Sequence, residues 1–211
     1  MNTLNQIYFI DFYNSLLDGD KQKCYDIVNF LLEDGHSILD IYVDLFQKSL
    51  YRIGKLWDQR ELSISEEHMA SNIISSLIER FSPEPSRKRE EKVIVTCIDK
   101  EFHEIGAKMV TKVFELNGFN TFFLGANVPT KEILKFVRQI EPYFIAISWS
   151  LYLNLSRFLD VVDNLDKIFA NKTIFVGGQA LSENSDQLLK KFTNVKYIPT
   201  VKDLHQVLLN Y

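Results

Sequence analysis

The sequence is poor in cysteine and has no long apolar run. Its two cysteines, Cys24 and Cys97, lie far apart, which excludes a disulfide framework and a cysteine-based zinc site. We therefore expect a reducing, cytoplasmic environment. No segment approaches the roughly 20 apolar residues of a membrane span. The start of the chain has neither the basic region nor the small-residue cleavage site of a signal peptide, so we expect none. We also expect no membrane partner.

An excess of positive charge is also missing. The chain has 24 lysines and arginines against 28 aspartates and glutamates, which disfavours direct nucleic-acid binding. Neither of the glycine-rich phosphate-binding patterns, G-x-G-x-x-G and G-x-x-x-x-G-K-[ST], occurs, so nucleotide cofactors lose support. Apolar residues are abundant, at 46% of 211 residues with 16 phenylalanines and nine tyrosines. This is enough for one large globular domain or two small ones.

Residues 1–81 carry apolar side chains at helical spacing. The pattern predicts four helices, over residues 5–17, around 25–32, over 38–57 and over 63–81. Short polar or glycine-containing turns separate them, and Ser63 with Glu66 matches a capping box at the start of the last helix. We expect a small helical bundle.

Residues 82–91 differ from both neighbours in composition. Two prolines and a run of charges predict an exposed linker. The basic triplet Arg87, Lys88 and Arg89 could contact a phosphate, but the composition favours a solvated linker.

Residues 92–211 alternate between strand-like and helix-like segments. Strands are predicted at 93–98, 120–124, 143–148, 173–176 and 195–198, with helices at 103–117, 130–140, 153–169, 187–192 and 201–209. This order predicts an α/β domain with a doubly wound parallel sheet, Rossmann-like and of the flavodoxin-like kind. Such sheets bind ligands outside the carboxyl ends of their strands.

The residues that follow these strands suggest one ligand slot. His103 stands where the first strand meets a helix, and Glu101 could accept one of its ring N–H groups, which would fix the tautomer. The remaining candidates offer hydroxyls or lack a side chain: Ser148, Ser150, Gly106, Gly177 and Gly178. Simpler interpretations stay open, because a histidine that opens a helix is commonly a cap and Gly-Gly is commonly a turn.

The combined spacing is more specific than any single residue. The order E-x-H-x-x-G, S-x-S and G-G closely resembles the cobalamin-binding signature D-x-H-x-x-G, S-x-L and G-G of methionine synthase, corrinoid proteins and related mutases. The resemblance implies that His103 is the lower axial cobalt ligand. It further implies that the channel for the cofactor's tail is lined by Gly106, Ser148, Ser150, Gly177 and Gly178. Glu101, Glu104 and Ile105 are further cofactor-binding candidates. Glu101 replaces the usual Asp, and Ser150 replaces the usual Leu.

A second motif lies in the predicted bundle. Trp57 and the pair Glu67 and His68 form W-x9-E-H, which resembles light-sensing cobalamin regulators of the CarH type. That resemblance implies a bundle covering adenosylcobalamin, with Trp57 against the adenosyl group and Glu67 and His68 nearby. Asp58 stands where some of these regulators have a second cobalt-binding histidine. We do not expect Glu67 and His68 to act as an acid/base pair, because adjacent helical residues do not face each other.

These resemblances favour a stand-alone sensor rather than an enzyme. In this hypothesis light cleaves the cobalt–carbon bond of adenosylcobalamin, and the bundle shifts to change association with a second copy or a separate regulator protein. The alternative is a corrinoid methyl carrier of a methyltransferase system, and haem binding or no tetrapyrrole is a third option. A radical mutase is least favoured, because the chain has no room for a separate substrate barrel.

Overall fold

The computed structural model describes residues 6–82, 84, 85, 87–181 and 185–211. The chain divides into two compact units, Met1–Pro83 and Glu84–Tyr211. Asn5, the first residue of the first predicted helix, lies outside the described residues, as do Pro83 and Ser86 of the predicted linker.

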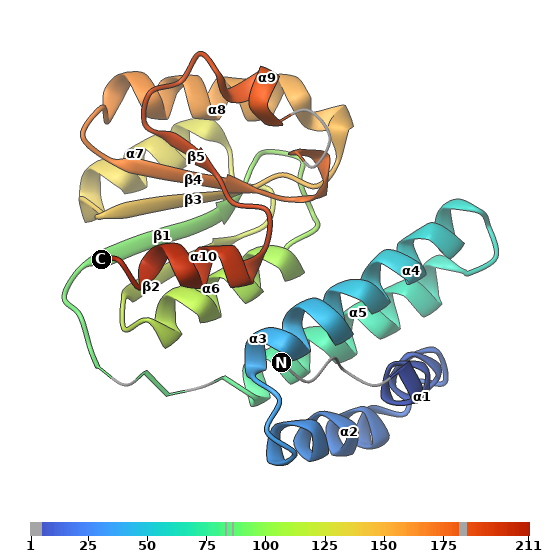
Figure 1. Ribbon diagram of the computed structural model, residues 1–211. Coiled ribbons are helices and arrows are strands. Elements are labelled where there is room, and N and C mark those ends of the chain that lie inside the picture. The colour runs from blue at the N-terminus through green and yellow to red at the C-terminus, as the bar shows by residue number, and fades with distance from the viewer. Residues whose placement is uncertain (1–5, 83, 86, 182–184) are drawn as a thin grey trace. The chain divides into compact units, whose positions relative to one another are not determined.

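The first unit consists of helices, as the apolar spacing predicts (Figure 1). Its elements are α1 (Gln6–Leu17), α2 (Lys21–Glu33), α3 (Ile38–Asp40), a π-helix (Ile41–Gln47), α4 (Lys48–Asp58) and α5 (Ile64–Arg80). The backbone stays helical at Ile41 and Lys48, so α3, the π-helix and α4 form the third predicted helix with a widened middle. Helix α1 packs against α2 and α5, and α4 packs against α5.

Local sequence explains where α5 begins. Ser63 Oγ accepts a hydrogen bond from Glu66 N at 3.3 Å, and Glu66 Oε2 accepts one from Ser63 N at 2.8 Å. The predicted capping box is therefore present. Burial of apolar side chains holds the helices together, and the rings of Phe12 and Phe46, both fully buried, stack with centroids 5.6 Å apart.

The second unit is an α/β domain, as predicted. Its strands are β1 (Lys92–Cys97), β2 (Asn120–Gly125), β3 (Phe144–Ser148), β4 (Thr173–Gly177) and β5 (Val195–Tyr197). They form one parallel sheet in the order β2-β1-β3-β4-β5, which is the flavodoxin-like order. Its helices are α6 (Ile105–Leu116), α7 (Thr130–Ile140), α8 (Leu155–Ile168), α9 (Ser185–Leu189) and α10 (Val201–Leu208), with short 3₁₀ turns at Tyr152–Asn154 and Gln179–Leu181.

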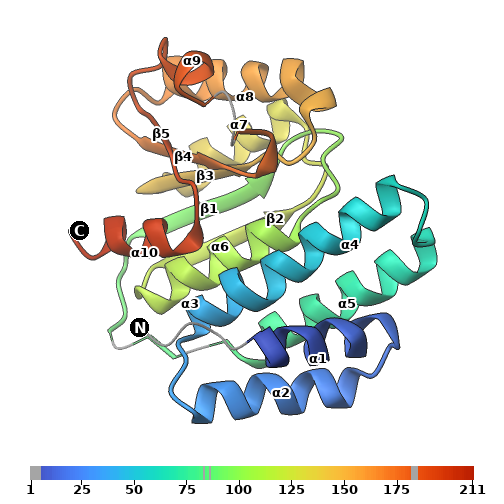
Figure 2. The same ribbon diagram turned by 45° about the vertical axis from the view of Figure 1, so that its right-hand side comes forward.

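Helices cover both faces of this sheet. Figures 1 and 2 show α6 and α10 on one face and α7 and α8 on the other. The β-branched run of β1 is buried from Val93 to Cys97, as is all of β3. Such strands are apolar on both faces because both faces are covered. Phenylalanine rings of β3 and β4 pack toward α6, where the Phe144 and Phe175 centroids lie 5.0 Å apart.

The strand order reverses at β1. The next strand, β2, pairs on one side of β1, and β3 pairs on its other side. The carboxyl ends of β1 and β3 therefore border the crevice at which such folds bind ligands. Among the described residues, no helix combines the length and apolar character that a membrane crossing requires.

Candidate functional site

A buried carboxylate joins the two loops at this crevice. Glu101, in the loop after β1, has no exposed surface. Its Oε1 lies 2.6 Å from His103 Nδ1 and also accepts a hydrogen bond from His103 N at 3.1 Å. Its Oε2 accepts hydrogen bonds from the backbone N–H groups of Ser150 and Leu151, both at 2.9 Å. One carboxylate thus holds the histidine and the loop after β3 together.

These hydrogen bonds keep Glu101 ionised. Burial alone would raise the pKa of Glu101, but the hydrogen bonds from the His103 ring and from three backbone amides outweigh it and lower the pKa to about 2. With an anion at Nδ1, the neutral imidazole keeps its proton on that nitrogen, and Nε2 then carries the lone pair. The His103 side chain is 57% exposed. It is therefore oriented as a nitrogen ligand with a carboxylate behind it, the arrangement that metal-binding histidines use.

Hydrogen bonds also join the loop after β1 to the loops after β2 and β3. Lys100 N donates to Asn127 Oδ1 at 2.9 Å, and Asn127 N donates to Glu101 O at 2.8 Å. Asn154 Nδ2, from the loop after β3, donates to Lys100 O at 3.1 Å. Lys100 and Asn127 both adopt left-handed backbone angles, with φ of 61° and 56°. Three loops at the carboxyl edge of the sheet therefore fix the backbone that carries His103.

Gly178 closes the crevice on the β4 side. Its φ is 116°, and a Cβ there would lie 2.1 Å from Trp149 O. Trp149 N donates to Gly177 O at 2.9 Å, and the fully buried Trp149 ring stacks on Phe158 at 4.5 Å. The glycine thus permits a close approach of two backbones, and a contact of Gly178 with a ligand stays a prediction.

The structure brings most of the residues predicted in this domain to one edge. Ser148 pairs in register with Gly177 and with Cys97, and its side chain is largely buried. Gly106 is exposed, and a Cβ there would meet nothing within 4 Å. Glu104 precedes α6 and forms an ion pair with Lys108 at 3.0 Å, and Ile105 begins that helix.

Apolar side chains also stand exposed around this edge. Phe102, beside His103, is 64% exposed, and Tyr152 and Leu153 after β3 are 56% and 89% exposed. Exposed apolar groups in one place mark a surface that another body covers. Together with a single histidine ligand they suit a large, partly apolar metal complex that brings its remaining ligands with it.

Leu151 is one contributor to the site that the sequence does not predict. Its backbone N–H donates to Glu101, as does that of Ser150, and a contact of the Ser150 hydroxyl with a ligand stays a prediction. Backbone donors carry no side-chain signature. The sequence offers one indirect signal: a glutamate buried beside His103 would need further hydrogen-bond donors.

The residues of W-x9-E-H lie in the first unit. Trp57 is 48% exposed and borders a hollow of about 530 Å3 that is also lined by Asp58, Arg60, Glu61, Leu62 and Ser63. Glu67 Oε2 lies 2.6 Å from His68 Nδ1, and Ser71 Oγ donates to Glu67 Oε1 at 2.7 Å. The expectation that Glu67 and His68 do not meet is wrong, because a flexible glutamate reaches around the helix to its neighbour. A contact of Trp57, Glu67 or His68 with a cofactor stays a prediction.

Comparison with known protein families identifies both units. The model described as "B12 binding domain" matches residues 91–198, and a second model of the same description matches residues 10–81.

Curated relatives are corrinoid proteins of methanogenic archaea. The chain is 19% identical over 178 residues to trimethylamine corrinoid protein 1 of Methanosarcina acetivorans, covering 81% of this chain and 82% of that protein. It is 21% identical over 172 residues to the methanol–corrinoid protein of Methanosarcina barkeri, covering 81% and 67%. Among solved structures, the monomethylamine corrinoid protein of M. barkeri has the same fold, with a TM-score of 0.83 at 17% identity over 98% of this chain and 99% of that one.

These findings correct the light-sensor hypothesis. The relatives are named as corrinoid proteins of methylamines and methanol, and one similar structure is a methanol:cobalamin methyltransferase complex. A helical unit before a B12-binding unit is therefore not specific to photoreceptors, and W-x9-E-H is too short to outweigh matches along the chain. Cobalamin or corrinoid binding stands, and sensing light does not. Since the family model matches more than half of the residues, the chain belongs to the B12 binding domain family.

Proposed function

We propose that this protein is the corrinoid-carrying component of a methyltransferase system. The observation that carries the proposal is the Glu101–His103 pair at the crevice of a B12 binding domain. The corrinoid relatives from methylamine and methanol systems support it. In this proposal the chain is not a complete enzyme by itself but one subunit of a catalytic system.

His103 is the residue that would bind cobalt through Nε2. A bound corrinoid would supply a metal centre able to accept a methyl group from one partner and yield it to another. Glu101 holds the proton at His103 Nδ1 and, as an anion, makes Nε2 a stronger donor. Its hydrogen bonds to the Ser150 and Leu151 amides keep the ring from turning away.

The neighbouring small residues would accommodate the rest of the cofactor. Gly106 leaves open space beside His103, which fits the close approach of a flat macrocycle. We propose that the tail of the corrinoid runs along the edge where Ser148, Ser150, Gly177 and Gly178 meet. Glu104 and Ile105 would border it from the start of α6.

The relatives suggest the kind of partner. We propose that a separate methyltransferase loads the corrinoid from a small methylated compound of the methylamine or methanol class. In that role the methyl form of the cofactor is the functional one, in place of the adenosyl form that the photoreceptor hypothesis required.

Cofactor preference and transfer test this proposal. Protein loaded with methylcobalamin labelled with carbon-13 in the methyl group should transfer the label to a thiol when a corrinoid-dependent methyltransferase is added. The His103→Ala variant should transfer at least tenfold less, and the Ser65→Ala variant, altered at an exposed position of α5, should match the wild type. A protein that binds adenosylcobalamin but never transfers a methyl group would contradict the proposal.

A further inference from the structure

The basic triplet before β1 is exposed at Arg87 and Lys88, but Arg89 is held against the turn that follows α6. Arg89 N donates to Gly118 O at 2.7 Å, and Arg89 Nε donates to Asn117 O at 2.9 Å. The guanidinium also lies 4.5 Å from the centre of the Phe119 ring. A Cβ on Gly118 would lie 2.2 Å from Arg87 O, so the backbone of the triplet fits closely against the turn between α6 and β2.

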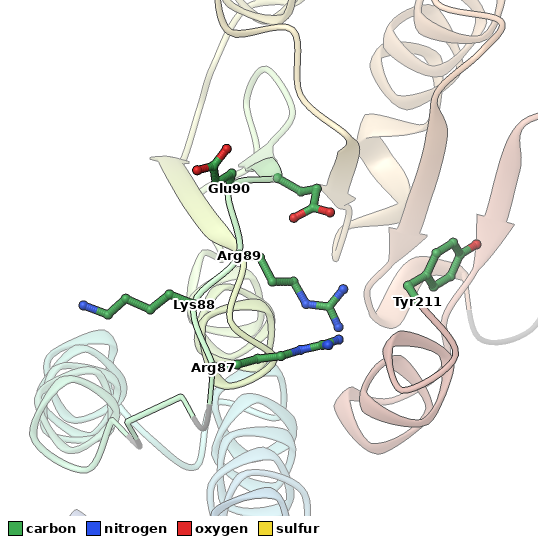
Figure 3. A pocket seen from close by; sticks show the side chains of 6 residues that line it. Arg87, Lys88, Arg89, Glu90 and Tyr211 are labelled. Atoms are coloured by element: carbon green, nitrogen blue, oxygen red, sulfur yellow. The ribbon is translucent and has the colours of Figure 1, made fainter.

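The three side chains of the triplet point to two different sides. Figure 3 shows Arg87 and Arg89 directed toward the space beside Tyr211, whereas Lys88 points away from it. These residues line a hollow of about 680 Å3, together with Glu90 and Glu91.

Among the described residues, neither guanidinium group forms an ion pair, although the carboxylates of Glu90 and Glu91 line the same hollow. The Glu90 carboxylate points away from both in Figure 3. Guanidinium groups bind tetrahedral oxyanions through paired N–H groups, and a prearranged side chain such as Arg89 loses less freedom on binding.

We propose that Arg87 and Arg89 form a binding site for a phosphate group. Two adjacent positive charges match a phosphate dianion. The carboxylates of Glu90 and Glu91 at the rim disfavour a long polyanion such as nucleic acid. The site adjoins the amino end of β1, whereas His103 follows its carboxyl end, so it is separate from the corrinoid crevice.

The ring of Tyr211 allows an experiment to distinguish free phosphate from a phosphate group on a larger molecule. It borders the hollow and packs against Phe144 with centroids 4.9 Å apart. A phosphate monoester with an aromatic body could place that body against the Tyr211 ring, whereas inorganic phosphate cannot.

Calorimetric titration of the full chain with inorganic phosphate and with phenyl phosphate tests the site, at constant ionic strength set with chloride. We expect saturable binding of one phosphate group, and at least tenfold weaker binding in the Arg87→Gln variant. The Lys88→Gln variant removes the same charge from the opposite side and should bind as the wild type does. Equal affinities for the two ligands indicate free phosphate, and tighter binding of phenyl phosphate that is lost in Tyr211→Ala indicates a larger phosphate monoester.

Two results would overturn the proposal. One is the absence of saturable binding by either ligand. The other is an equal loss in Arg87→Gln and Lys88→Gln, which would reduce the effect to net charge. Unfolding curves of both variants in chloride are the control for stability. Arg87 makes no side-chain hydrogen bond to another described residue, so we expect its replacement to leave the fold intact.

Discussion

At the scale of single residues, Glu101 contributes to both stability and ligand orientation. Its pKa falls from the ordinary 4.5 to about 2 in the folded chain. A lowered folded-state pKa stabilises the fold above the unfolded pKa, and that contribution is lost as the pH falls toward the folded value. The relevant window is therefore between about pH 4.5 and pH 2.

The Glu101→Gln variant should consequently be less stable by about 3 kcal/mol near neutral pH. Urea unfolding of wild type and variant, followed by circular dichroism at about pH 7 and about pH 3, measures the difference at each pH. We expect the difference to shrink at the lower pH, because Glu101 of the wild type begins to be protonated in the unfolded state. A difference that stays constant with pH would show that the carboxylate charge is not the cause.

Two glycines at the site should respond in opposite ways to the same substitution. Gly178→Ala forces a Cβ to 2.1 Å from Trp149 O at a φ of 116°, so we expect a loss of more than about 2 kcal/mol. Gly106→Ala meets open space within a helix, so stability should hold or rise by up to about 1 kcal/mol.

The affinity for a corrinoid is a second property that the Gly106→Ala substitution should change. Gly106→Ala should weaken binding while the fold stays intact, because the added methyl group occupies the surface that we propose the cofactor approaches. Unfolding curves and equilibrium dialysis with methylcobalamin measure the two effects. Unchanged affinity in Gly106→Ala would remove Gly106 from the cofactor surface.

At the scale of elements, the start of α5 depends on its cap. Ser63→Ala removes the acceptor for Glu66 N and should cost about 1 kcal/mol. Ser65→Ala, two residues further at an exposed position of the same helix, is the matched control and should be neutral. Thermal unfolding followed by circular dichroism checks the pair. Equal effects in both variants would show that helix propensity, not capping, governs this helix.

Most elements could be predicted from the sequence, because each has a local cause. Apolar spacing predicts the helices of the first unit, and β-branched runs between helices predict the five parallel strands. The flavodoxin-like character was predicted as well. The π-helix at Ile41–Gln47 was not, since its apolar residues recur at the same spacing as those of an ordinary α-helix.

Contacts between residues far apart in the sequence could not be predicted at the site. His103 and Glu101 are found by spacing, but the Ser150 and Leu151 amides that donate hydrogen bonds to Glu101 lie 49 and 50 residues further along the chain. The anchoring of Arg89 by Asn117 likewise depends on the turn between α6 and β2. Long-range hydrogen bonds of this kind have no pattern in the sequence.

At the scale of the whole molecule, one cofactor-binding plan serves more than one function. The E-x-H-x-x-G, S-x-S and G-G motifs predict cobalamin binding, and the match to the B12 binding domain family confirms this prediction. The function that motif reasoning ranked first was wrong, because the helical unit also precedes the B12-binding unit in the methylamine corrinoid protein of the same fold. A few residues in the sequence predict that a cofactor binds, but they do not predict how the cofactor is used.

The proposed function depends on His103 as the residue that would bind the cobalt of a corrinoid. Electron paramagnetic resonance of the protein loaded with Co(II) cobalamin, prepared with natural and with nitrogen-15 protein, tests this most directly. A ligand nitrogen from the protein gives a triplet splitting that becomes a doublet on labelling, and we expect this change in the wild type and in His68→Ala. It should disappear in His103→Ala. A triplet that persists in the labelled wild type would show that the cofactor's own base remains bound, and would contradict the assignment of His103.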